Sequence, residues 1–474
     1  MLSVVISLMA DVIGDRGLWH ENIVKIHKSF GWAKAIVYFC NTILLNMKRA
    51  FFCFLCLFAV SLITDAQQAW YDIKNNPNLA GSNYVAYHGP HKRLAPSPKG
   101  YEPYYISHYG RHGSRYLINS PDYDKPFFVL SRADSLGKLT LAGRDVLRKV
   151  ELIREEAKLR GGELTSLGVQ QHHAIARRMI LRFPTVFSGD ASVDARSTTV
   201  IRCILSMESA LQELVAHNPR LRVCHDASRH DMYYMNDQNN KYCDLRDTPQ
   251  TQAMLRAFQS KHVNYNHLMR YLFNDSAYAG HIDAADMGTR LFNLAANVQS
   301  TELRHQISLW DIFTDEERYN TWRYNNVGWY IYSGPCKQVD GAGMYTQVNL
   351  LKNIIFTADS CLLLPHPGVT LRYGHEVNVL PLVCLLNLNG YGEAVDDLEQ
   401  LDMRGWNNYD IFPMACNVQF IFYKPQKGMP TAANALVKVL LNEDECTLPI
   451  PTDCAPYYHW QDVRAYFLNR ISGK

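Results

Sequence analysis

One stretch, residues 104–116, constrains the fold of this chain more than any other. It reads Tyr-Tyr-Ile-Ser-His-Tyr-Gly-Arg-His-Gly-Ser-Arg-Tyr. The first half predicts a buried strand, because Tyr and Ile favour a pleated backbone and Gly110 and Gly113 mark where the strand breaks. Ligands of open α/β sheets bind at the carboxyl ends of strands, where this turn would lie. The stretch therefore predicts an α/β sheet with a ligand site directly after the strand.

The turn that follows the strand carries two arginines and a histidine. Arg111 and Arg115 are four residues apart, so both can face one anion if a helix begins after the turn. His112 lies between them, and neighbouring positive charge favours its neutral form. A neutral imidazole beside an anion clamp is a nucleophile aimed at a phosphorus atom. An ordinary basic surface turn is the alternative, but the five-residue pattern R-H-G-x-R after a strand rarely arises by accident.

The run Arg-His-Gly-Ser-Arg-Tyr, residues 111–116, resembles the signature of the histidine phosphatase superfamily, in particular its acid-phosphatase and phytase branch. The Tyr after the second arginine, Tyr116, resembles the pattern of the multiple inositol polyphosphate phosphatases more than that of the members with Pro at this position. The resemblance implies a phosphoglycerate-mutase-like, three-layer α/β sandwich. Its mixed, mostly parallel sheet is flanked by helices, and a mainly α-helical cap domain is inserted into it.

The length of 474 residues allows two domains, or one domain with a large insertion. Residues 231–334 are rich in Met, Tyr, Asn, His and Arg, and helical patterns such as 252–272 and 284–303 predict a mainly helical insertion. By resemblance this insertion is the cap, between a first part (67–230) and a second part (335–474) of the catalytic domain. Its candidates for binding a polyanion are Lys241, Arg246, Arg256, Lys261, Arg270 and Arg290.

The charge and the N-terminal sequence bear on partners and compartment. A net charge of +3 without a basic run argues against nucleic acid as a partner. The basic start Met-Lys-Arg and the apolar run 50–63 predict a signal peptide at 47–66, too short to span a membrane. We therefore expect an exported, periplasmic or secreted protein that begins near Gln67, without residues 1–46 and without stable membrane association. The alternative is an anchor built from residues 35–45 and the later run.

Nine of the twelve cysteines follow the predicted signal peptide. Export permits disulfides, and an odd count leaves at least one thiol free. Cys446 and Cys454 flank a Pro-rich loop and are the predicted pair, with Cys224 and Cys243 as a weaker second pair. Neither CxxC pairs nor histidine clusters of zinc spacing occur in this part of the sequence, so no structural metal is expected.

A second candidate anion site follows the strand predicted at 192–195. Two helices precede this strand, at 139–160 and 165–183, with Thr140 and Thr165 as their N-caps. The next helix runs to residue 217, is capped from 197–199, and has Arg202 in its first turn. A strand that leads into a helix N-terminus is an anion-binding geometry. In the family an arginine here completes the phosphate clamp, and Arg196 is the competing candidate.

Strands are predicted again at 354–356, 369–373 and 417–423, and the second leads into Gly374-His375-Glu376. The acid-phosphatase branch has Asp directly after this histidine, whereas the inositol polyphosphate branch more often has His-Ala-Glu. This chain has Glu in the Asp position and Val377 where the other Glu would be. The extra methylene extends the carboxyl by about 1.5 Å, which preserves the acid role but weakens the subfamily assignment.

These residues together suit phosphomonoester hydrolysis. The resemblance makes His112 the nucleophile and Glu376 the acid and then the base, with a phosphate clamp of Arg111, Arg115, Arg202 and His375. No metal or cofactor is required, because the arginines neutralise the transferred group. We expect a secreted, phytase-like enzyme for inositol polyphosphates. A broader acid phosphatase for sugar or other small monoesters is the alternative. A silent binder of phosphorylated ligands is disfavoured, since nucleophile, clamp and acid are all present.

Overall fold

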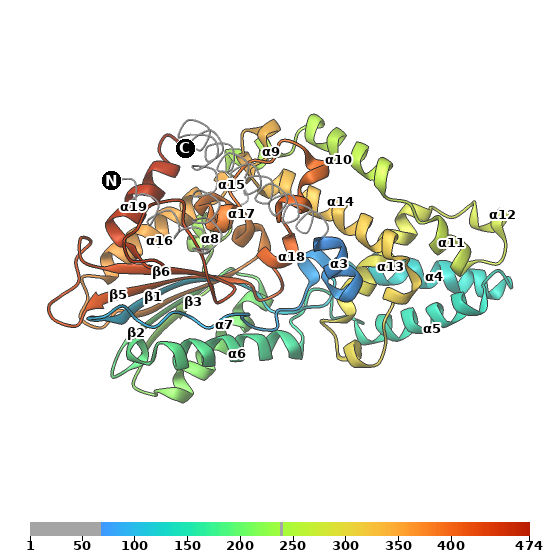
Figure 1. Ribbon diagram of the computed structural model, residues 1–474. Coiled ribbons are helices and arrows are strands. Elements are labelled where there is room, and N and C mark those ends of the chain that lie inside the picture. Colours follow the sequence, from blue (N-terminus) through green and yellow to red (C-terminus); the bar gives the residue numbers. More distant parts are fainter. Residues whose placement is uncertain (1–67, 238–239) are drawn as a thin grey trace, which may run out of the picture. The chain divides into compact units, whose positions relative to one another are not determined.

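The computed structural model describes residues 68–237 and 240–474 (Figure 1). The predicted signal peptide, the segment before it and the alternative anchor lie outside these residues. In the described part, no helix is both long enough and apolar enough to cross a bilayer.

A central mixed sheet organises the α/β part of the chain. Its strands are β1 (Tyr101–Arg111), β2 (Ser192–Ser197), β3 (Arg222–Asp226), β4 (Gly368–Gly374), β5 (Asn417–Pro425), β6 (Leu436–Leu441), β7 (Asp444–Glu445) and β8 (Tyr458–His459). Their order is β3-β2-β4-β1-β5-β6-β7, with β8 also paired to β6. Strands β1 to β4 run parallel, and β5 to β8 are antiparallel to their neighbours. The predicted mixed sheet is confirmed, with a larger antiparallel share than expected.

Helices cover both faces of this sheet. One face carries α6 (Ser166–Arg182) and α7 (Ile201–His217), and the other carries α16 (Val348–Cys361), α17 (Glu376–Leu386) and α19 (Trp460–Arg470) (Figure 1). Strand β1 is buried on both sides: Tyr105 and Tyr109 pack in the core under α16 and α17, and Ile106 packs in the core with α6 and α7. Burial on both faces explains why the last eight residues of this strand are all buried instead of alternating between buried and exposed.

One predicted strand is corrected by the structure. Residues 354–356 belong to helix α16 rather than to a strand, because Leu351, Ile354, Ile355 and Ala358 recur at helical spacing and are all buried. Outside the elements predicted from the sequence, the segment before residue 100 contains α3 (Gln68–Asn75) and a 3-10 segment (Pro77–Tyr84), and the chain after β5 contains β6 to β8 and α19.

The segment 231–334 is helical in the residues described. It contains α8 (Met232–Met235), α9 (Lys241–Arg246), α10 (Pro249–His262), α11 (Asn266–Leu272), α12 (Ser276–Ala279), α13 (Ala284–Val298) and α14 (Asp315–Ser333). The predicted helix 252–272 is thus two helices. Several of these helices share one apolar core with α4 (Pro121–Ser135) and α5 (Leu141–Glu156), which precede the segment in the chain. We give the name helical lobe to α4, α5 and α10 to α14; α10 contacts α14, but its Phe258 belongs to the core under α16 and α17 (Figure 1). The domain boundaries stay a prediction.

The predicted disulfides are absent from the structure, where all nine cysteines of the described residues are free. Cys446 is buried in the core under α16, α17 and α19, whereas Cys454 packs against the core on the face of α6 and α7. The sheet therefore separates the two thiols of the Cys446–Cys454 pair. Cys224 and Cys243 are unpaired as well.

Candidate active site

The register of two parallel strands brings the Arg-His-Gly turn and the His-Glu turn together. Arg111, the last residue of β1, is paired with Gly374, the last residue of β4. The backbone N–H of His112 donates to the carbonyl of Gly374 over 2.9 Å. His375 and Glu376 follow directly, so the candidate nucleophile and the candidate acid leave neighbouring strand ends. This is the edge of the sheet at which the sequence predicted a ligand site.

The loop after β1 is held by helices α6 and α7. A Cβ at Gly113 would lie 2.4 Å from the carbonyl oxygen of Gly168, so this close approach of loop and helix requires glycine. The N–H of Gly113 donates to Ser206 Oγ (3.1 Å), and the N–H of Ser114 donates to Gln171 Oε1 (2.8 Å). No helix begins directly after the turn; the next helix, α4, begins at Pro121. Irregular backbone tied to two helices therefore positions the motif.

His112 is completely buried, and its ring has one defined orientation. Its Nδ1 lies 2.9 Å from the carbonyl oxygen of Gly113, so the Nδ1–H donates there and the Nε2 lone pair faces the site. Burial lowers the pKa of His112 well below its usual value, and Arg111 and Arg115 add to this effect despite the opposing carboxylate of Glu376. The imidazole is therefore neutral, as a nucleophile must be.

Arg111 is buried under the site and held from two sides. One of its terminal nitrogens donates to the carbonyls of Asn83 (2.6 Å) and Phe412 (3.1 Å). Its Nε lies 3.0 Å from Glu376 Oε2. The guanidinium is thus fixed in place, and its second terminal nitrogen, Nη2, is buried without a hydrogen-bond partner among the described residues.

Arg115 and Arg202 bring two more positive charges to the same place. Arg115 lies on the loop and is 3% exposed, and Arg202 is the second residue of α7. The Nε atoms of both are buried without a hydrogen-bond partner in the described part of the chain. Burial lowers the pKa of Arg202, and the charge of Arg115 lowers it further. Two like charges held together in this way suit a polyvalent anion.

The alternative clamp residue, Arg196, has other partners. It lies in β2, and its guanidinium contacts the carboxylates of Asp194 (2.8 Å) and Asp231 (3.9 Å). The caps expected for α7 at 197–199 are also not used, because Val200 occupies the N-cap position without a side-chain hydrogen bond.

His375 occupies the N-cap position of α17, beside His112. The two ring centroids are 5.6 Å apart. His375 Nε2 lies 3.2 Å from Thr198 Oγ1, and Cys203 Sγ packs against the ring. Burial lowers the pKa of His375 to about 4, with Arg202 and Arg111 acting in the same direction against Glu376. The ring is therefore a neutral hydrogen-bonding group at this site.

Glu376, the first residue of α17, is the carboxylate among these groups. Its Oε2 lies 3.0 Å from Arg111 Nε and 3.6 Å from His112 Nε2, and its Oε1 accepts from Asn83 Nδ2 over 3.5 Å. Burial raises the pKa of Glu376, but the charge of the adjacent Arg111, with a smaller contribution from Arg115, outweighs burial and holds this pKa well below its usual value. In this state the side chain is a carboxylate placed next to the nucleophile.

The same residues include a group with metal-ligating spacing. The ligand atoms of His112, His375 and Glu376 lie within 4.8 Å of one another. The guanidinium groups of Arg111 and Arg115 act on these residues, which makes the place electropositive. Such surroundings favour an anion over a dication.

The sequence analysis gave no role in the site to several residues that contact it. Asn83 comes from the lead-in, Thr198 from the end of β2, and Gln171 and Ser206 from inside helices. A buried polar residue on an otherwise apolar helix face was the one signal that pointed to Gln171 and Ser206. Asn83 had none, because its contacts are with residues far along the chain.

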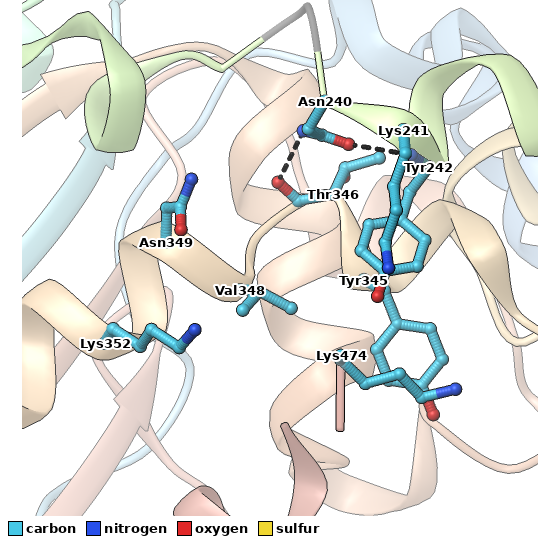
Figure 2. Close-up of a pocket in the computed structure, with 9 residues that line it drawn as sticks. All are labelled: Asn240, Lys241, Tyr242, Tyr345, Thr346, Val348, Asn349, Lys352 and Lys474. Atoms are coloured by element: carbon cyan, nitrogen blue, oxygen red, sulfur yellow. Dashed lines mark hydrogen bonds between the residues drawn. The ribbon is translucent and has the colours of Figure 1, made fainter. Parts of the chain in front are cut away.

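Two hollows outside this cluster involve residues of the segment 231–334. Figure 2 shows one of about 190 Å³, lined by Lys241, Lys352 and Lys474 together with Asn240, whose side chain bonds to Thr346 and Tyr242. None of the six predicted site residues lines it. A second, of about 400 Å³, includes Val377, the residue after Glu376. We call it the Val377 hollow; it is lined mainly by Arg246, Asp247, Tyr324, Asn325, Trp329 and Tyr332.

The sequence matches the profile of the histidine phosphatase superfamily, branch 2, over residues 110–442. Since this match spans well over half of the chain, the chain belongs to that family, as its motif predicted. No curated protein sequence matches it.

Solved structures of phosphatases share the fold. The structure is similar to the multiple inositol polyphosphate phosphatase of Bifidobacterium longum with phosphate, at 17% identity and a TM-score of 0.66, over 82% of this chain and 97% of that one. It is also similar to the phytase from D. castellii, at 14% identity and a TM-score of 0.63, over 84% of this chain and 86% of that one. The predicted α/β fold class is thereby confirmed.

Proposed function

We propose that this chain hydrolyses phosphomonoesters through a phosphohistidine formed on His112. The observation that carries the proposal is the surroundings of His112 Nε2. A carboxylate oxygen of Glu376 lies 3.6 Å from this atom and 3.0 Å from Arg111 Nε, so an anionic oxygen is already accommodated there. An oxygen of a phosphate group in the same place would meet Arg111, Arg115 and Arg202 with the nucleophile behind it.

The first step is the transfer of the phosphoryl group to histidine. The N–P bond forms at Nε2 of neutral His112 while the P–O bond to the leaving group breaks. Negative charge on the transferred oxygens is stabilised by the three arginines and by His375. The carboxyl of Glu376 gives its proton to the leaving oxygen. In the second step water attacks phosphorus, Glu376 accepts the proton of that water, and the N–P bond breaks.

Substrate binding has to convert Glu376 from a carboxylate into an acid. A phosphate dianion competes with Glu376 for Arg111, the group that most strongly opposes burial in setting the pKa of this carboxyl. When the charge of the bound phosphate offsets that of Arg111, burial and the new negative charge both favour protonation of Glu376. Binding of the substrate phosphate therefore also leads to protonation of Glu376, which can then act as the acid.

The proposed substrates are inositol polyphosphates such as phytate. Solved structures of the Bifidobacterium longum phosphatase with the same fold are complexes with phosphate and with inositol hexasulfate. In this chain Arg246, on α9, lines the Val377 hollow and is a cation able to meet a further phosphate of such a substrate.

A broader acid phosphatase is the second candidate, and the same hollow favours it. The lining includes Tyr324, Trp329 and Tyr332, which suit a planar or apolar leaving group better than a polyanion. Two of the predicted polyanion ligands, Lys261 and Arg290, are already paired with carboxylates. A phosphate-release assay that compares kcat/KM for phytate with that for glucose phosphates and phenyl phosphate decides between the two. Preference for phytate supports the first candidate, and equal or higher values for the other substrates support the second.

The proposed place of action is outside the cytoplasm, as a periplasmic or secreted protein processed near Gln67. The support is the signal-peptide pattern at residues 47–66. N-terminal sequencing of the exported protein tests this proposal. A protein that retains Met1 and stays inside the cell contradicts it.

A further inference from the structure

A short segment before the sheet contacts three of the residues that surround the phosphate site. It consists of Ser82, Asn83 and Tyr84, at the end of the 3-10 segment that follows α3. The carbonyl of Asn83 accepts from Arg111 over 2.6 Å, and its side-chain amide donates to Glu376 Oε1 over 3.5 Å. The next residue, Tyr84, has its ring 5.5 Å from the guanidinium carbon of Arg115.

The backbone of this segment is held in an uncommon conformation. Ser82 has φ 55° and ψ −121° inside an otherwise helical stretch, and it is buried. Its hydroxyl accepts from Asn408 Nδ2 over 2.7 Å, and Asn408 is itself fixed by Trp322 Nε1 over 2.9 Å. A residue other than glycine keeps such a conformation only when its surroundings enforce it, and such residues cluster at functional sites. The result is that Asn83 is presented to the site by a firmly anchored backbone.

The two oxygens of Glu376 have different neighbours as a consequence. Oε1 is bonded to the Asn83 amide, whereas Oε2 points to Arg111 and to the Nε2 of His112. An acid for the leaving group must have one oxygen at the bond that breaks, and its other oxygen is then free to be anchored. When a bound phosphate offsets the charge of Arg111, the attraction between Arg111 and Oε2 weakens, whereas the contact of the Asn83 amide with Oε1 does not depend on that charge.

We propose that Asn83 is the positioning residue of the acid, with its amide anchoring Glu376 Oε1 so that Oε2 is aimed at the leaving group. This inference rests on the proposed function. It assigns Asn83 a role in proton transfer, and the backbone carbonyl of the same residue fixes Arg111 independently of the side chain.

The test separates the side chain of Asn83 from its backbone. Asn83→Ala removes the amide but leaves the carbonyl on Arg111. An alkyl phosphate needs a proton on its leaving oxygen, whereas an activated aryl phosphate such as 4-nitrophenyl phosphate does not. We expect Asn83→Ala to lower kcat for glycerol phosphate by about 10–100-fold and the rate of phosphoenzyme formation from 4-nitrophenyl phosphate by less than about threefold. The control is Asn76→Ala, which removes the cap of the same 3-10 segment at its other end.

A second variant gives a signature that a purely structural residue would not. Asn83→Asp preserves the shape but places a carboxylate beside Glu376, which raises the pKa of Glu376. The alkaline limb of kcat for glycerol phosphate should therefore move to higher pH, by about one unit. An unchanged limb, or an equal loss on both substrates in Asn83→Ala, overturns the inference. If the wild-type protein lacks phosphatase activity, the proposed function itself fails; if it is active and both Asn83 variants match it, the assignment of Asn83 alone fails.

Discussion

The candidate active site and the helical lobe differ in how their arginines are paired with carboxylates. In the lobe, Arg290 bonds to Asp122 at 2.8 Å and to Asp286 at 2.8 Å. Arg323 lies near Glu399 (3.2 Å) and Asp402 (3.7 Å). At the site three arginines gather around the single carboxylate of Glu376, and two of them have a buried Nε without a partner among the described residues.

Both regions contain arginines, so the residue type alone does not distinguish a binding site from a structural contact. The absence or presence of a paired carboxylate does distinguish them. A paired arginine lowers the free energy of the fold, whereas arginines that repel one another raise it until an anion binds. An anion that binds at the site therefore relieves repulsion between arginines and gains affinity from it, whereas the paired arginines of the lobe offer no such gain. Substitutions at the site should therefore lower activity more than stability, and substitution of a paired arginine in the lobe should lower stability more than activity.

The largest effect is expected for His112→Ala. The imidazole is the only proposed nucleophile, so turnover should fall by about 10⁴-fold or more while the fold is kept. Phosphate release measures the loss, and quenching the wild type without acid during turnover should trap labelled phosphate on His112. Label on another residue, or a variant with appreciable activity, contradicts the assignment.

Glu376→Gln should have the next largest effect, and it should depend on the leaving group. Without a transferable proton, hydrolysis of an alkyl phosphate should slow by about 10²–10⁴-fold. Phosphoenzyme formation from an activated aryl phosphate should suffer much less, and slow dephosphorylation should remain as the defect. Glu376→Asp should keep part of the activity. Equal slowing of phosphoenzyme formation from both substrates would mean that Glu376 positions another group instead of moving a proton.

Arg202→Met tests the site, where arginines lack paired carboxylates. Loss of one clamp charge should lower kcat/KM by about 10²–10³-fold. Because Arg202 and Arg115 repel each other, the free energy of unfolding should stay constant or rise by about 1 kcal/mol. Steady-state kinetics and thermal denaturation measure the two quantities. A variant that loses stability as well as activity would show that Arg202 has a structural partner.

The sequence was sufficient to predict the local elements that carry this site, but not which of its charged residues are paired. Strand β1, the caps Thr140 and Thr165, and the location of Arg202 in the first turn of α7 follow from neighbours within a few residues, and the structure contains them as predicted. The meeting of His112 with Glu376 depended on the resemblance, because strand order is not written in a local pattern.

What could not be predicted depends on contacts across long separations. Helix α16 was mistaken for a strand because its short Ile-Ile-Phe run looks β-branched, and the burial pattern of the surrounding turns decided otherwise. Asn83 contacts a carboxylate 293 residues later, and Arg290 contacts Asp122 from 168 residues away. Whether an arginine is paired therefore becomes visible only in the folded chain.

Arg290→Met is the matched counterpart of Arg202→Met in the helical lobe. It leaves Asp122 and Asp286 facing each other without their shared cation, and burial already raises the pKa of Asp122. We expect a loss of about 1–2 kcal/mol in the free energy of unfolding and kcat/KM within about twofold of the wild type. Thermal denaturation and phosphate release test both. A loss of activity comparable to that of Arg202→Met would place this lobe arginine at the substrate and break the comparison.

Lys261→Met should have the smallest effect. The lysine is largely exposed, with 64% of its side chain accessible, and it contacts Glu399 at 2.7 Å. Glu399 also contacts His262 (2.8 Å) and Arg323 (3.2 Å), so its charge stays compensated when Lys261 is lost. We expect a change of at most about 0.5 kcal/mol in the free energy of unfolding and a KM for phytate within about twofold of the wild type.

The variant to compare with Lys261→Met is Arg246→Met. Arg246 lines the Val377 hollow, so it should raise KM for phytate without affecting KM for phenyl phosphate. If Lys261→Met raised KM for phytate as much as Arg246→Met, pairing with a carboxylate would not prevent a lobe cation from binding substrate.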